Sequence, residues 1–89
     1  PKLSFCDLRD YLSNLEDSLT ITEISFLLSR DFTYSPAFRL LGPLLITATL
    51  EFTRQQLLSP RDQDSIKTSY LSFLDMLLLS CESAVARAI

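Results

Sequence analysis

The 89-residue chain contains no histidine and no tryptophan, and it has a single glycine. Without histidine, it lacks the side chain that most often acts as a general acid or base. One glycine is too few for the glycine-rich loops that hold phosphate groups in nucleotide-binding enzymes. The sequence also contains no nucleophile elbow and no metal-ligand spacing. These absences predict a protein that is not an enzyme and that uses no cofactor and no metal ion.

Cysteine is also scarce, with only Cys6 and Cys81. Two cysteines cannot form a disulfide framework. Antiparallel pairing of the first and last helices would bring them close to each other, so the sequence leaves their pairing open. We favour two reduced thiols in an intracellular protein, either cytoplasmic or nuclear. No apolar run reaches the roughly 18 residues that a membrane span needs, since the stretch from Tyr70 to Leu79 is interrupted by Ser72 and Asp75.

What the sequence has in quantity is hydrophobic residues, which make up 47% of the chain. Together with the scarcity of glycine, this composition favours a well-packed helical domain over a disordered segment. The length leaves room for one domain, residues 1–89, and the start at Pro1 instead of methionine indicates a piece of a larger protein. Eleven acidic residues against eight basic ones argue against a surface that binds nucleic acid through its charge.

Two helix starts are marked near the N-terminus. Ser4, with Asp7 three residues later, can cap a first amphipathic helix. Its narrow apolar stripe comprises Phe5, Leu8, Leu12, Leu15 and Leu19. Thr20 and Glu23 have the spacing of a capping box, which predicts a second helix from Ile21 to about Ser29. The narrow stripe predicts that the first helix lies on the outside of the domain.

Two proline-containing pairs divide the middle of the chain. Ser35-Pro36 opens a short third helix, Pro36 to Leu41, because proline suits the first helical position. Gly42-Pro43 then ends that helix and starts a fourth, from about Leu44 to Leu58; the alternative is one helix kinked at Pro43. The fourth helix carries two apolar faces and should therefore have neighbours on two sides. One face comprises Leu45, Ala48 and Phe52, and the other comprises Ile46, Leu50 and Leu57.

Ser59-Pro60 opens the last helix, whose firm part is Ser65 to Ala88. At 1.5 Å per residue this helix is about 36 Å long, which equals or exceeds the expected diameter of the domain. It either spans the domain as its central element or projects into a partner. The fold class that follows is all-α, a compact bundle of about five helices with a long C-terminal helix.

A projection of the last helix at ~100° per residue separates a core side from a polar side. The core side comprises Ile66, Tyr70, Phe73, Leu74, Leu77, Cys81, Ala84 and Ala88. On the opposite side Leu79 lies among polar residues, flanked by Leu71, Met76 and Leu78. A monomer seldom exposes several adjacent apolar side chains, so we expect these four residues to bind a partner.

Three aromatic residues are further candidates for partner binding. Phe32 and Tyr34 fall in an expected connector, and in an extended segment their side chains would point to opposite sides. One of them should therefore face the core and the other a partner. Phe26 lies off the apolar face of the second helix and is the third candidate.

The resulting hypothesis is a non-enzymatic protein–protein interaction domain, either a scaffold or adaptor or an oligomerisation unit. Its partner would be a helix or peptide of another protein, or a second copy bound through the C-terminal helix. The alternative is a small nucleic-acid-binding domain with a helix-turn-helix made of the second and third helices. Such a third helix would offer only Arg39 to a groove. The other basic candidates, spread with Arg39 around the second to fifth helices, are Arg30, Arg54, Arg61 and Lys67.

Overall fold

The computed structural model of the chain describes residues 4–33 and 35–88. Within these residues it forms four α-helices: α1 (Phe5–Ser13), α2 (Ile21–Phe32), α3 (Pro36–Leu58) and α4 (Gln63–Ala88). A short 3-10 helix, η1 (Pro60–Asp62), joins α3 to α4, and no described residue belongs to a strand. The all-α class and the long C-terminal helix are thus confirmed, with four α-helices in place of about five.

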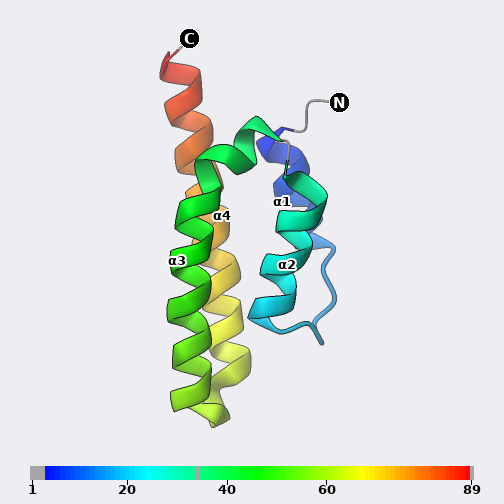
Figure 1. Ribbon diagram of the computed structural model, residues 1–89, viewed down its shortest axis with the longest axis vertical. Coiled ribbons are helices and arrows are strands. Elements are labelled where there is room, and N and C mark those ends of the chain that lie inside the picture. Colours follow the sequence, from blue (N-terminus) through cyan, green and yellow to red (C-terminus); the bar gives the residue numbers. More distant parts are fainter. Residues whose placement is uncertain (1–3, 34, 89) are drawn as a thin grey trace.

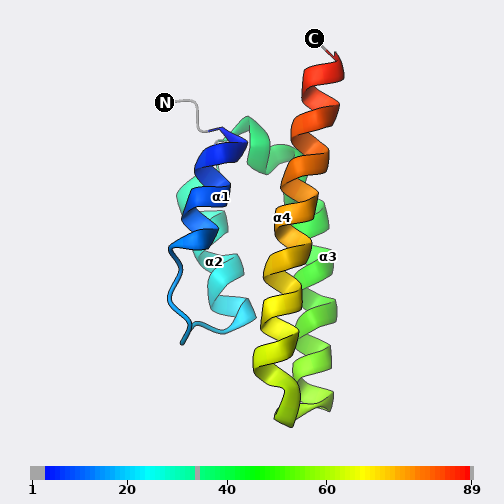
Figure 2. The same cartoon turned by 180° about the vertical axis from the view of Figure 1, so that it is seen from behind.

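The helices form two antiparallel pairs that lie side by side (Figure 1). α3 and α4 make a long hairpin, and α1 and α2 cover one side of it, as the view from behind also shows (Figure 2). The molecule measures 44 × 22 × 18 Å, and its long axis follows this hairpin. The C-terminal end of α4 extends past the other helices, so α4 both packs along the domain and projects beyond it.

All four helices contribute to one core. Its buried side chains are Leu8, Ile21, Ile24, Leu28, Phe32, Leu41, Leu45, Ala48, Tyr70, Leu74 and Leu78. The ring of Tyr70 packs edge-on against Phe52, and its hydroxyl shares a 2.8 Å hydrogen bond with the hydroxyl of Thr49. This central tyrosine therefore joins α4 to α3 through an apolar and a polar contact.

The two N-terminal caps expected from the sequence are confirmed. The Ser4 hydroxyl accepts a hydrogen bond from the backbone N–H of Asp7, and the Thr20 hydroxyl accepts one from Glu23. In return, each carboxylate accepts a hydrogen bond from the backbone N–H of its capping residue. Both helix starts are therefore complete capping boxes, which satisfy backbone donors that the helix itself leaves free.

Two helix ends differ from the prediction. α1 ends at Ser13, so Leu15 and Leu19 of the expected stripe pack against the core from the loop that follows. α2 continues to Phe32, beyond the predicted end at Ser29. The side chain of Phe32 is consequently placed by a helix and not by a connector.

The predicted third and fourth helices are one helix, α3, with Pro43 inside it. Gly42 does not adopt the left-handed conformation that ends many helices, since no described residue has a positive φ. Pro43 cannot donate a hydrogen bond to the carbonyl four residues earlier, and its ring crowds that turn, so the helix bends there. Figure 1 shows the start of α3 crossing the end of the bundle before the helix runs alongside α4. The kinked-helix alternative is therefore correct.

The buried side of α4 also differs from the prediction. Its fully buried side chains are Tyr70, Leu74 and Leu78. The buried face is thus rotated about the helix axis, relative to the predicted face, by about half of the ~100° between successive residues. Asp75, expected on the solvent side, is accordingly turned toward α1, where its half-exposed carboxylate accepts a 2.9 Å hydrogen bond from Nε of Arg9. Phe73, expected in the core, is 39% exposed as a result of the same rotation.

Candidate protein-interaction surface

α3 presents the second of its two apolar faces to solvent. Ile46, Leu50 and Leu57, which we call the α3 row, are 63%, 69% and 75% exposed. Their spacing of four and seven residues places them along one side of the helix. The first apolar face holds Leu45 and Ala48 in the core. The domain itself therefore provides no covering neighbour for the α3 row, and the expectation of neighbours on two sides is not met within the described residues.

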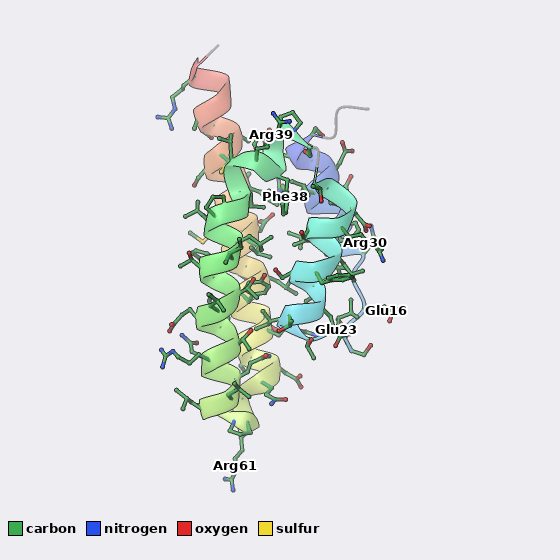
Figure 3. The ribbon with its side chains drawn as sticks, in the orientation of Figure 1. Glu16, Glu23, Arg30, Phe38, Arg39 and Arg61 are labelled. Carbon is green, nitrogen blue, oxygen red and sulfur yellow. The ribbon has the colours of Figure 1, made fainter. Side chains whose placement is uncertain are left out.

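Phe26 of α2 lies beside Ile46, at one end of this row, and is 65% exposed, as its position in the sequence predicted. Phe26 and Ile46 both line a hollow of about 340 Å³ between α2 and α3. Its other lining residues are either apolar (Phe38, Gly42 and Leu45) or bear hydroxyl groups (Thr22, Ser25, Ser29 and Thr49). Figure 3 shows Phe38 below the bend of α3, on the side toward α2. At ~30 Å³ for a water molecule, the hollow has room for an aliphatic side chain.

The candidate residues of α4 have different environments. Met76 and Leu79 are exposed, as expected. Leu71 is half-buried and packs against the core. Leu78 is fully buried, so the expectation that it faces a partner is wrong. An exposed pair, Met76 and Leu79, remains of this candidate surface.

Phe32 is the member of the Phe32 and Tyr34 pair that faces the core, as expected of one of the two. Phe32 is buried against Tyr11 of α1, with ring centroids 5.1 Å apart and ring planes at 86°. Phe32 is therefore a core residue, and the prediction that it contacts a partner directly is wrong. The argument from an extended connector fails because Thr33 has helical dihedral angles, φ −52° and ψ −37°. Tyr34 lies outside the described residues.

Several charged groups outside this surface are bonded to each other. Arg30 donates to Asp31 at 2.8 Å, and the Tyr11 hydroxyl donates to the same carboxylate at 2.7 Å. The bond from Arg30, followed by that from Tyr11, lowers the pKa of Asp31. Burial, together with the bond to Asp31, raises the pKa of Tyr11 to about 12. On α3, the hydrogen bond from Arg54 lowers the pKa of Glu51. None of these groups lines the hollow.

Other kinds of site find little support in the described part of the chain. Within residues 4–33 and 35–88, no three His, Cys, Asp or Glu side chains gather where they could hold a metal ion. Cys6 and Cys81 are both free thiols. No described helix combines the length and apolarity needed to cross a membrane. Figure 3 shows Arg39 and Arg61 at opposite ends of the molecule, so these two arginines do not share one basic surface.

The α3 row was visible in the sequence as a pattern but not as an exposed surface. Periodicity identifies Ile46, Leu50 and Leu57 as one apolar face. The same periodicity fits a face buried within the domain and a face left for a partner. Only the arrangement of the other three helices, which pack elsewhere, distinguishes the two cases.

Comparison of the chain with protein-family models, with curated proteins and with solved structures finds no match. The function has to be inferred from the surface itself. The features that carry this inference are the α3 row, the hollow beside it and the absence of charge from both.

Proposed function

We propose that this chain is a non-enzymatic protein–protein interaction domain that docks an amphipathic helix against α2 and α3. The observation that supports this function is the α3 row, three large aliphatic side chains exposed on one side of α3, of which Ile46 shares a hollow with the exposed ring of Phe26. Complete burial of such a side chain contributes ~1.5–3 kcal/mol. A partner that covers all four would gain most of this free energy, which is why exposed apolar patches mark interaction sites.

The spacing of the row favours a helix as the partner. Ile46, Leu50, Thr53 and Leu57 follow one another at intervals of four, three and four residues. This alternation is the repeat of a helix–helix seam. At 1.5 Å per residue the row extends over about 16 Å, so about three turns of a partner helix would cover it. An apolar side chain of that helix would enter the hollow between Phe26 and Ile46.

The surface would select its partner by shape more than by charge. The row and the lining of the hollow carry no charged side chain, and the charged residues that border the Leu57 end are of both signs: Asp17, Asp64 and Lys67. The nearby Arg54 is bonded to Glu51 at 2.7 Å. Coulombic attraction therefore contributes little, and we expect the affinity to change little when salt is raised.

The nucleic-acid alternative has less support. Three arginines are paired with carboxylates in the described residues: Arg9, Arg30 and Arg54. We expect no submicromolar binding of duplex DNA at ~150 mM salt, because affinity of that kind follows the number of phosphates that a basic surface neutralises. Tight binding of DNA that weakens steeply with added salt would favour the nucleic-acid alternative over the protein-interaction function.

A displayed library of amphipathic helical peptides tests the proposed function. We expect it to yield peptides with micromolar dissociation constants, whose affinity falls more than tenfold in the Leu50→Glu variant. Leu58→Glu is the matched control, because Leu58 is 69% exposed like Leu50 and lies on the same helix outside the row. Peptides whose affinity is unchanged by Leu50→Glu, or a library that yields no binders, would contradict the proposal. Peptides that respond only to Leu79→Glu would place the site on α4.

A further inference from the structure

The surface formed by α2 and α3 carries both a protrusion and a hollow, at different levels of α3. Leu57 is the most exposed residue of the row, whereas the hollow lies near Gly42 and Ile46. A two-fold contact between identical surfaces needs both features on each copy. Building on the proposed function, we propose that the docked helix is α3 of a second copy, in an antiparallel two-fold contact centred on Leu50.

The register of this contact follows from positions along α3. Leu57 lies seven residues after Leu50, and Pro43 lies seven residues before it. Antiparallel pairing centred on Leu50 therefore sets Leu57 of one copy opposite Pro43 of the other, next to Gly42. The two-fold axis keeps α2 of both copies on the same side of the paired α3 helices, so Leu57 is directed toward the hollow. A methyl group placed on Gly42 would lie 3.8 Å from the Phe38 ring, so glycine leaves this wall open.

The absence of charge favours a second copy over a partner of another kind. A two-fold contact brings groups close to their own counterparts, so a charged surface would repel itself. The α3 row, Phe26 and the lining of the hollow are uncharged in a chain in which 21% of residues are charged. In the proposed register Arg54 lies opposite Ile46, with its guanidinium held by Glu51. Between residues 43 and 57 the register therefore sets no two like charges opposite each other.

The size of the surface sets the strength of the dimer. The row is about 16 Å long, and two adjacent helices are about 20 Å wide, which gives an area on the order of 300 Å² per copy. A standard stable interface contributes roughly 800 Å² from each partner. The area is less than half of this, so the dimer is weak and forms only at high protein concentration.

Sedimentation equilibrium at protein concentrations between ~5 µM and ~1 mM tests whether the partner is a second copy of the chain. We expect the wild-type mass to rise from monomer to dimer over this range. Leu50→Glu should remain monomeric, while Leu58→Glu, equally exposed before the change, should dimerise like the wild type. A wild-type chain that is monomeric at ~1 mM overturns this inference, and the peptide library then decides the proposed function separately. A dimer that is lost with Leu79→Glu but kept with Leu50→Glu lies on α4 and also overturns it.

A disulfide across the two-fold axis tests the register. In a chain that carries Cys6→Ser and Cys81→Ala, oxidation of Leu50→Cys should give a covalent dimer, because residue 50 meets its own counterpart. Met76→Cys is the control, since Met76 is similarly exposed but lies on α4. Circular dichroism checks that each variant is folded. No covalent dimer at position 50, or equal yields at positions 50 and 76, overturns the proposed contact.

Discussion

The two apolar faces of α3 consist of the same kinds of residue in opposite environments. Leu45 is 1% exposed, whereas Leu50, five residues further along the same helix, is 69% exposed. Helix propensity and hydrophobicity are identical at the two positions, so neither explains the difference. The difference lies in the neighbours, because α2 and α4 pack against the face that carries Leu45. An apolar periodicity therefore identifies a helix face whose burial is favourable. It does not tell whether the covering surface belongs to the same chain or to a partner.

The largest effect is expected from a matched pair of phenylalanines on α2. Phe32 is buried against Tyr11, so Phe32→Ala should destabilise the fold by ~3–5 kcal/mol. Phe26 is exposed, and Phe26→Ala should change the free energy of unfolding by less than ~0.5 kcal/mol. Urea denaturation at low micromolar concentration, where we expect the chain to be monomeric, measures both. Similar losses in the two variants would mean that Phe26 is also part of the core.

A second pair compares the two faces of α3 directly. Leu45→Ala should cost ~2–5 kcal/mol, because it leaves a cavity among well-packed neighbours. Leu50→Ala should leave the free energy of unfolding within ~0.5 kcal/mol of the wild type at the same low concentration. The two denaturation midpoints should therefore be clearly separated. Equal midpoints would remove the distinction between a buried and a docking face.

A smaller effect is expected from two threonines of α3. The Thr53 hydroxyl oxygen is buried and has no hydrogen-bond partner among the described residues. Thr53→Val removes this unpaired group at nearly constant shape, and should raise the free energy of unfolding by ~1 kcal/mol. In contrast, Thr47 is exposed and donates to the Pro43 carbonyl at 3.1 Å, so Thr47→Val should bring no gain. Thermal denaturation that shows equal shifts for both would contradict the account of Thr53.

The smallest effect concerns pH and the Tyr11 hydroxyl, which joins α1 to Asp31 of α2. The pKa of Tyr11 is raised from 10.0 to about 12, so the folded state retains the proton longer than the unfolded state does. Its contribution to stability is complete below pH 10.0 and is lost as pH rises toward about 12. The melting temperature should decline over this interval, and less steeply in Tyr11→Phe. Burial also raises the pKa of Tyr70, so part of the decline should remain. Identical slopes in the two proteins would contradict the role of Tyr11.

Signals contained within one helical turn predicted the structure better than signals that depend on distant partners. The capping box of Thr20 and Glu23 is confirmed because both residues lie at the same helix start. The predicted rotation of α4 was wrong because it depends on how α1, α2 and α3 pack against it, including the pairing of Asp75 with Arg9, 66 residues away, which no local pattern marks. Leu78 is consequently buried, against expectation. The exposure of the α3 row is a property of the same kind, since it depends on where α1, α2 and α4 pack.

Methyl chemical shifts report most directly on whether the α3 row is the surface through which the domain associates. Over a series from ~20 µM to ~1 mM, the methyl signals of Ile46, Leu50 and Leu57 should move together with one dissociation constant. The signals of Leu58 and Leu79, also exposed, should stay in place. Shifts confined to Leu79 and Met76, or no shifts at all, would contradict association through the α3 row.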